Sequence, residues 1–325
     1  MSIDIQRRKL LGAAAAYATV LAAGSRAHAS GFPTRPVTLV VPYAAGGATD
    51  ALLRAMQPSL GKTLGQAVIE NKPGASGLLG ANQLMKAAPD GYVLSIIPEA
   101  AFRVPQMQKT AFDPLRDFTY IIHLAGYGFG MAVRADAPWK TWNELVADAR
   151  KHPGKISFGS AGLNSTMHFT MEEIMDKAGI ELTHIPYKGE ADLVNALLGG
   201  HVDIGIASGP LTPHTTSGRA RVLLMWTANR TRRYPDIPTL REVGYDMVSM
   251  APFGLVGPKG MNPATVQRLH DAFKKALDEP EGRAALERLE LENAYLNSTA
   301  YAAYAQEQFE RQRKLIRRLN LRAAN

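Results

Sequence analysis

Short runs rich in β-branched residues alternate with longer amphipathic stretches along most of the chain. In the first part of the chain, this pattern predicts strands at 37–41, 67–69 and 93–97 and helices at 50–60 and 78–88. Strands that alternate with helices usually pair in parallel through crossover connections. The pattern therefore predicts an α/β fold with parallel sheets.

The same alternation returns further along the chain. It predicts strands at 156–158, 182–185, 202–207 and 221–227 and helices at 165–178, 191–198 and, near the end, 299–319. The segment Thr141-Trp142-Asn143-Glu144 has the form of a capping box, in which Glu144 accepts from the backbone N–H of the cap. Asn262-Pro263 has the form of a cap followed by a first-turn proline. Two complete α/β units predict two lobes.

The first 29 residues have the pattern of a signal peptide. A basic segment, 7–9, precedes an apolar run, 10–23, and Ala27-His28-Ala29 predicts cleavage after Ala29. The apolar run is too short for a hydrocarbon core about 30 Å thick, and no later run approaches roughly 20 apolar residues, so we expect no membrane insertion. The paired arginines also allow the twin-arginine route, although Lys9-Leu10-Leu11 lacks its usual phenylalanine. Export by the Sec or the twin-arginine route would place the protein in the periplasm.

Composition narrows the chemistry. The 325 residues include no cysteine, which excludes disulfides, thiolate metal sites, a cysteine nucleophile and a lipid-anchoring cysteine. The formal net charge of +8 suits an anionic ligand. The basic residues are nevertheless scattered and are not interleaved with aromatic residues, so we expect no nucleic-acid partner.

A glycine-rich loop lies between the first predicted strand and helix. Glycines let the backbone approach a ligand, and the helix that follows offers unpaired N–H donors to an anion. An ordinary turn capped by Thr49 or Asp50 is the simpler interpretation of this segment alone. The loop supplies the candidate ligand-binding residues Tyr43, Ala44, Ala45, Gly46, Gly47 and Thr49.

A second loop of the same kind, 158–168, occurs in the other half of the chain. Its hydroxyl groups could hold a carboxylate oxygen or an ordered water. Neither loop matches a phosphate-binding motif, so we expect no nucleotide and no cofactor. The second loop supplies the candidates Ser160, Ala161, Gly162, Ser165 and Thr166.

Two arrangements of residues would instead indicate an enzyme. Ser160 with His184 or His201 could be drawn as a hydrolytic triad, and His168 with Glu172 could place two ligands on one metal. The motifs Gly-x-Ser-x-Gly and His-Glu-x-x-His are both absent. We therefore expect no catalytic residue and no metal site.

Isolated charged residues leave two further possibilities open. Lys188 either places a cation at a cleft or is a solvated loop residue. Glu99 follows the strand 93–97, and if it faces a cleft it would repel an acid and favour an amine or hydroxyl at the far end of the ligand. Trp139, Trp142 and Trp226 are expected to serve packing.

Six segments together resemble one family over nearly the whole mature chain. They are Val40–Asp50, Glu70–Gly77, Ala88–Tyr92, Gly159–His168, His184–Gly189 and Leu198–Asp203. Their sequences and order are similar to those of the Bug-type periplasmic receptors of tripartite tricarboxylate transporters.

This resemblance implies a type II periplasmic-binding-protein fold with a ligand cleft between two lobes. Lobe 1 would comprise 30–130 plus 252–325 and lobe 2 would comprise 131–251. The protein would capture a small carboxylate by lobe closure, as a monomer, and deliver it to an inner-membrane permease. A role as the ligand-sensing partner of a membrane signalling receptor is the alternative.

The resemblance also implies where the ligand contacts lie. The two loops would hold the carboxylate, partly through water, with Ser76 near the cleft and Ala207 and Ser208 closing its far side. Many relatives have an aspartate where this chain has Ala207-Ser208-Gly209, so an amino-acid ligand bound through that carboxylate is less expected. Met250-Ala251-Pro252-Phe253 and Pro98-Glu99 also depart from the family pattern, which leaves the ligand unnamed.

Overall fold

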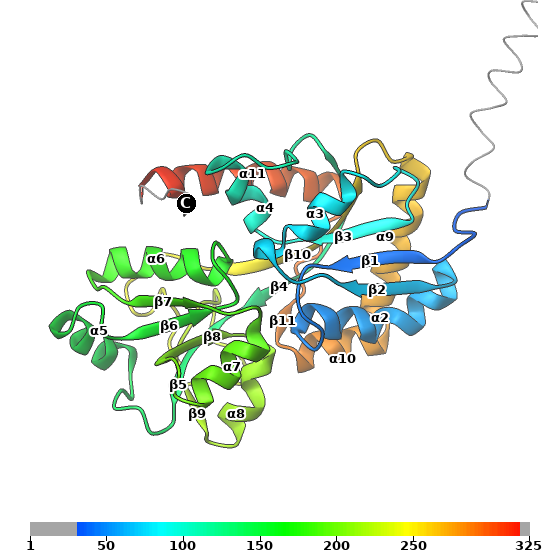
Figure 1. Ribbon diagram of the computed structural model, residues 1–325. Helices are drawn as coiled ribbons and strands as arrows, with labels where there is room; N and C mark the ends of the chain where they lie inside the picture. The colour runs from blue at the N-terminus through cyan, green and yellow to red at the C-terminus, as the bar shows by residue number, and fades with distance from the viewer. Residues whose placement is uncertain (1–30, 319–325) are drawn as a thin grey trace, which may run out of the picture.

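The computed structural model describes residues 31–318, and its strands form two separate sheets (Figure 1). The expected signal peptide, 1–29, and its cleavage site lie outside the described residues. The larger sheet has the order β11-β4-β10-β3-β1-β2. Its strands are β1 (Val37–Val41), β2 (Ala67–Asn71), β3 (Val93–Ile97), β4 (Phe118–Gly128), β10 (Met250–Pro258) and β11 (Leu291–Glu292).

Helices cover both faces of this six-stranded sheet, with α3, α4 and α11 on one face and α2, α9 and α10 on the other (Figure 1). We call this sheet and its helices lobe 1. The helices are α2 (Ala48–Leu64), α3 (Leu79–Leu84), α4 (Ala100–Arg103), α9 (Pro263–Asp278), α10 (Pro280–Arg288) and α11 (Ser298–Arg318), with short 3-10 turns at Ala75–Gly77 and Val104–Gln106.

The second sheet has the order β7-β6-β8-β5-β9 and forms lobe 2 with its own helices. Its strands are β5 (Gly130–Arg134), β6 (Ser157–Ser160), β7 (Thr183–Pro186), β8 (Ile204–Ala207) and β9 (Ala220–Met225). The helices are α5 (Trp142–Lys151), α6 (Thr166–Ala178), α7 (Glu190–Leu198) and α8 (Thr212–Thr216), with a 3-10 turn at Gly209–Leu211.

The strands and helices expected from the sequence are present, but the expectation of wholly parallel sheets is wrong. Strands β1, β2 and β3 pair in parallel, as do β6, β7 and β8, whereas β10 is antiparallel to both β3 and β4. Strand β5 is antiparallel to β8 and β9. Every antiparallel pair involves β4, β5 or β10, the strands next to the crossings between the lobes, and the sequence pattern did not predict these three strands.

Two local expectations differ in detail. Helix α3 is shorter than the range 78–88. Thr141 caps α5 by accepting from Glu144 N, but the Glu144 carboxylate accepts from Lys140 N at 2.7 Å rather than from the cap itself. Asn262 caps α9 as expected, with Pro263 in its first turn.

The chain crosses between the lobes twice, at Gly128–Gly130 and between β9 and β10. The expected lobe boundaries, 130/131 and 251/252, lie next to these crossings. That the two parts move as separate bodies about them remains a prediction.

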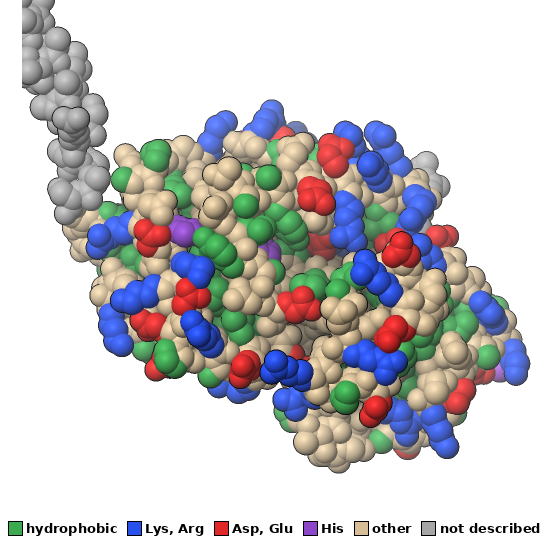
Figure 2. Space-filling model, turned by 180° about the vertical axis from the view of Figure 1, so that it is seen from behind, with side chains coloured by type: hydrophobic (Ala, Val, Ile, Leu, Met, Phe, Trp, Pro, Cys, Tyr) green, Lys and Arg blue, Asp and Glu red, His purple; other side chains and the backbone are tan. Residues whose placement is uncertain are grey.

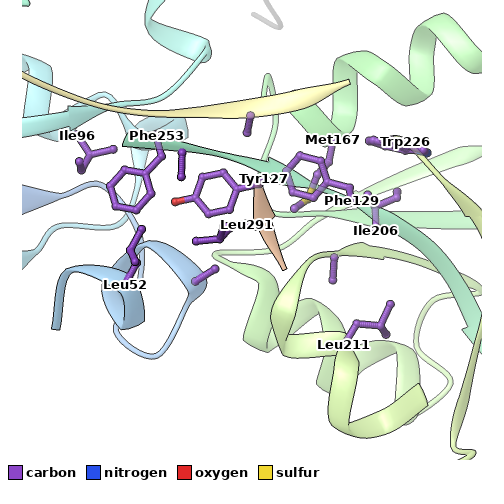
Figure 3. Packing of buried hydrophobic residues seen from close by; sticks show 14 of the residues in the cluster. Leu52, Ile96, Tyr127, Phe129, Met167, Ile206, Leu211, Trp226, Phe253 and Leu291 are labelled. Atoms are coloured by element: carbon purple, nitrogen blue, oxygen red, sulfur yellow. The ribbon is translucent and has the colours of Figure 1, made fainter. Parts of the chain in front are cut away.

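One apolar core runs through both lobes and across the first crossing (Figure 3). The rings of Tyr127 and Phe253 stack at 5.8 Å, and Phe129 meets the buried Trp226 edge-on at 5.8 Å. Of these four rings, those of Tyr127 and Phe129 face the space between the lobes. No helix within residues 31–318 is long and apolar enough to span a membrane.

Candidate ligand-binding site

A cavity of about 60 Å³ lies between the lobes, next to the rings of Tyr127 and Phe129. Since one water position needs about 10–15 Å³ measured in this way, the space suits a ligand of few heavy atoms. Its wall is formed by Tyr43, Ala44, Ala45, Gly47, Ala48, Thr49, Tyr127, Phe129, Ala161, Ser165, Thr166, Met167, Gly189, Glu190, Ala191 and Ala251.

The first glycine-rich loop reaches this cavity through the N-terminus of α2. Gly46 has a φ of +85°, which favours glycine, and Gly47 is the N-cap without a side-chain capping bond. Asp50 Oδ2 accepts from Gly46 N at 2.9 Å and from Arg54 Nε at 2.8 Å, which holds the loop in place. Neither Thr49 nor Asp50 caps the helix, so its first amides are left to face the cavity.

The second loop reaches the opposite wall through the N-terminus of α6. Ser165 caps this helix by accepting from His168 N at 3.3 Å. Ser165, Thr166 and Met167 line the cavity, as does Ala161 from the loop. The two loops expected to face each other are therefore brought together.

A third helix N-terminus, that of α7, enters the same cavity and was not recognised from the sequence. Gly189 is its N-cap, and Gly189, Glu190 and Ala191 line the wall. The signal was present, because a glycine again separates a strand from a helix. Each helix N-terminus carries partial positive charge, so α2, α6 and α7 together favour an anion.

Glu190 adds a carboxylate to this wall. Its Oε2 accepts from Ser208 N at 2.7 Å and from Ser208 Oγ at 2.8 Å. Burial raises the pKa of Glu190, although the two hydrogen bonds from Ser208 oppose that rise. Burial and the charges of Glu190 and Glu99 raise the pKa of Tyr43, so its phenol stays a hydrogen-bond donor.

Part of the expected site lies in the cavity wall, and part lies elsewhere. The candidates in the wall are Tyr43, Ala44, Ala45, Gly47, Thr49, Ala161, Ser165 and Thr166. Those outside it are Gly46, Ser76, Glu99, Ser160, Gly162, Ala207 and Ser208. Ser208, in the second group, hydrogen-bonds Glu190 of the cavity wall.

Glu99 and Ser76 connect the lobes instead of lining the cavity. Glu99 is 6% exposed, pairs with Arg103 at 3.2 Å and accepts from Thr166 Oγ1 at 2.9 Å. The Ser76 hydroxyl donates to Leu163 O at 2.6 Å. Lys188 is exposed and absent from the wall, in line with the solvated-loop interpretation.

Ser160 and His184 do approach each other, at 2.7 Å between Oγ and Nε2. Ser160 is nevertheless fully buried, and its hydroxyl donates to Gly162 O at 2.9 Å. Burial and the neighbouring His168 lower the pKa of His184 to about 3. In the described part of the chain no carboxylate hydrogen-bonds His184, and His201 is exposed, so the parts of a hydrolytic triad are not assembled.

His168 and Glu172 also stand close, with Nε2 and Oε1 3.4 Å apart. A metal centre needs at least three protein ligands in most catalytic sites. Within residues 31–318 no group of three or more histidine, aspartate or glutamate side chains is arranged to hold a metal ion. The pair is better described as a helix-surface contact.

A small cavity between two α/β lobes, lined by helix N-termini, defines a solute-binding protein of the periplasmic type. The model of the tripartite tricarboxylate transporter receptor family matches residues 52–321, and the chain belongs to this family. A Cupriavidus necator protein described as "UPF0065 protein in gbd 5'region" is 44% identical over 327 residues, covering 98% of this chain and all of the relative. The resemblance expected from the sequence is confirmed.

Solved structures of similar proteins support this family assignment. The periplasmic binding protein BugD is similar with a TM-score of 0.83 and 30% identity, covering 90% of this chain and 99% of BugD. MatC from Rhodopseudomonas palustris, solved with malate, has a TM-score of 0.81 and 29% identity, covering 88% and 100% of the two chains. An R. palustris protein solved with adipate has a TM-score of 0.83 and 28% identity, covering 89% and 98%. The expected class of fold is thereby confirmed.

Proposed function

We propose that this receptor captures a small carboxylate in the cavity between its lobes and delivers it to the inner-membrane permease of a tripartite tricarboxylate transporter. The convergence of the α2, α6 and α7 N-termini on one small cavity carries this proposal. Backbone amides at these positions hold an anion without a cationic side chain. The malate and adipate bound to structural relatives are both small dicarboxylates.

Lobe closure is the proposed mode of capture. Arg103 Nη1 donates to Ser165 O at 3.0 Å, beside the Thr166–Glu99 and Ser76–Leu163 hydrogen bonds. All three bonds join lobe 1 to the loop and first turn of α6. Closing the lobes forms them and encloses the ligand at once, which couples binding to the conformational change.

Export to the periplasm by the Sec or the twin-arginine route would follow from residues 1–29. We propose a binding role without catalysis. The Ser160 hydroxyl is buried and lies outside the cavity wall, and His184, whose pKa is lowered to about 3, has no carboxylate partner among residues 31–318. Figure 2 shows basic and acidic side chains interspersed over the viewed face, which suits a small-molecule receptor better than a nucleic-acid binder.

Native mass spectrometry of the protein purified from its own periplasm tests the proposal. We expect a small carboxylate near one per chain, released on denaturation, and a matching signal by calorimetry. Micromolar affinity corresponds to about 8 kcal/mol, which raises the melting temperature visibly at excess ligand. An empty protein that gives neither heat nor a thermal shift with a broad panel of carboxylates would contradict it.

A further inference from the structure

Glu190 is the one charged side chain in the cavity wall among the described residues. The other wall residues are apolar, hydroxyl-bearing or glycine, and no lysine, arginine or histidine is among them. A site for anions would be expected to exclude a carboxylate, because like charges disfavour each other at short range. The presence of Glu190 therefore calls for a ligand group that it can bind.

Glu190 has no cationic partner in the described part of the chain. Every ion pair between residues 31 and 318 joins other side chains. Ser208 supplies its N–H and hydroxyl to Oε2 alone, so Oε1 remains for a ligand. A carboxylate taken out of bulk water without a counter-charge is costly, and a bound cation would offset that cost.

The rest of the wall is arranged for the opposite charge. The N-termini of α2 and α6 come from different lobes, at 47–49 and 165–167, and present amides and the hydroxyls of Thr49 and Ser165. The Tyr43 phenol adds another donor in the wall. Donors for a carboxylate thus share one small cavity with a single acceptor that carries negative charge.

From this arrangement we propose that Glu190 makes the site specific for zwitterions. The ligand is a small carboxylate that also bears a protonated amino group, which pairs with Glu190 Oε1 while the carboxylate lies at the α2 and α6 N-termini. A hydroxyl at the same position donates one uncharged hydrogen bond and binds more weakly. An acid without either group leaves Glu190 unpaired.

Glu190 supplies the acidic group that is missing at Ala207-Ser208-Gly209. The absence of an aspartate there argued against an amino-acid ligand, yet Ser208 holds the carboxylate of Glu190 instead. The acidic group is supplied by the first turn of α7 and positioned by the loop after β8. Glu190 also replaces Glu99 as the carboxylate that favours an amine or hydroxyl on the ligand, because the Glu99 carboxylate is bound by Arg103 and Thr166.

The inference rests on the proposed carboxylate-binding function and is tested by calorimetry with two matched series. Propionate, lactate and alanine form one series, and succinate, malate and aspartate form the other; members of a series differ by hydrogen, hydroxyl or amino group at one carbon. In the wild-type protein we expect the amino compound of the series that fits to bind at least tenfold more tightly than the unsubstituted acid, with the hydroxy acid between them.

The variant Glu190→Gln keeps the shape of the side chain and an acceptor for Ser208 but removes the charge. We expect it to lose at least tenfold in affinity for the amino compound, while the unsubstituted acid binds equally or more tightly. Asp192→Asn, which removes an exposed carboxylate from the same first turn of α7 but outside the cavity wall, should retain the wild-type ranking. Should Glu190→Gln fold poorly by circular dichroism, the wild-type ranking alone decides the question.

The outcomes separate the two proposals. If the wild-type protein binds carboxylates but prefers the unsubstituted acids, or if Glu190→Gln leaves the ranking unchanged, the zwitterion inference is wrong and the carboxylate function stands. If no member of either series or of a wider carboxylate panel binds, both are wrong.

Discussion

The Thr166 hydroxyl donates a hydrogen bond of 2.9 Å to Oε2 of Glu99, and this bond joins the first turn of α6 in lobe 2 to the segment before α4 in lobe 1. Thr166 also lines the cavity, whereas Glu99 does not. One residue thus contacts the ligand space and holds the lobes together. Closure and ligand binding are expected to reinforce each other at this point.

Replacing this hydroxyl should favour the open form. Thr166→Val keeps the shape of the side chain but removes the donor to Glu99, at a cost of about 0.5–1.5 kcal/mol. From the proposed coupling of closure to binding, we expect ligand affinity to fall by roughly two- to tenfold, mainly through faster release, in stopped-flow measurements. Thr183→Val, at an exposed position within lobe 2, is the matched control and should bind as the wild type does.

Removing the carboxylate of Glu99 should be more damaging. Arg103 is fully buried, and Glu99 at 3.2 Å is its partner; the guanidinium also lies 4.3 Å over the Phe169 ring. Glu99→Ala leaves a buried charge uncompensated, which costs about 3–5 kcal/mol in comparable pairs. Urea denaturation measures this loss in the free energy of unfolding.

The double variant Glu99→Leu with Arg103→Met provides the control for this pair. It removes both charges and keeps the buried volume, so it should recover much of the stability that Glu99→Ala loses. If the free energy of unfolding of Glu99→Ala lies within about 0.5 kcal/mol of the wild-type value, the ion pair contributes little to stability.

Acid should destabilise the protein through His184. Burial and His168 hold the pKa of His184 at about 3, below its ordinary 6.5, so the folded chain keeps it neutral. Below pH 6.5 the unfolded chain binds a proton that the folded chain does not, and the free energy of unfolding falls as the pH drops toward 3. The ring stacks on His168 at 4.0 Å, and Glu172 is the charged neighbour of that pair.

His184→Gln should flatten this dependence between pH 6.5 and 4.5, above the range where most carboxylates titrate. Glutamine can still hydrogen-bond the Ser160 hydroxyl. Urea denaturation at a series of pH values measures the slope for both proteins. Equal slopes would show that His184 is protonated alike in the folded and unfolded chains.

The Tyr301 ring should make any side chain at position 254 destabilising. A Cβ atom built on Gly254 would lie 2.1 Å from Cζ and Oη of Tyr301, which is fully buried in the first turn of α11. We expect Gly254→Ala to lower the free energy of unfolding by about 1–3 kcal/mol, because a packed core does not yield freely.

Gly61→Ala is the contrasting variant. Gly61 lies inside α2 with open space around its Cα, so alanine should stabilise the helix by about 0.5–1 kcal/mol. Thermal unfolding of the two variants should therefore shift in opposite directions. A stabilising or neutral Gly254→Ala would mean that α11 can shift away from β10.

The sequence by itself determined the local order of this protein. The β-branched residues of β1, β2 and β3 and the caps Thr141, Ser165 and Asn262 act through neighbours in the chain, so their signals are complete in the sequence. The two glycine-rich loops could be recognised for the same reason. Their pairing across a cleft was expected because the same strand-loop-helix arrangement occurs in both halves of the chain, and the family resemblance implied it as well.

Only the tertiary structure decided which strands turn antiparallel and which charges meet. Strands β4 and β10 pair residues that lie 122 to 140 positions apart in the sequence, so their register depends on how the chain returns from lobe 2.

 Phe118 pairs with Pro258 and Gly128 with Met250, contacts that no sequence window contains. The placement of Glu190 and Glu99 depends on the same long-range geometry. Glu99 follows a strand at its carboxyl end, as a cleft residue would, but its carboxylate pairs with Arg103 in its own lobe and accepts from Thr166 of lobe 2. Glu190 instead lies in the cavity wall because α7 begins there. Local sequence fixes where a helix begins, whereas the direction of its first side chains relative to another lobe is set by packing between distant segments.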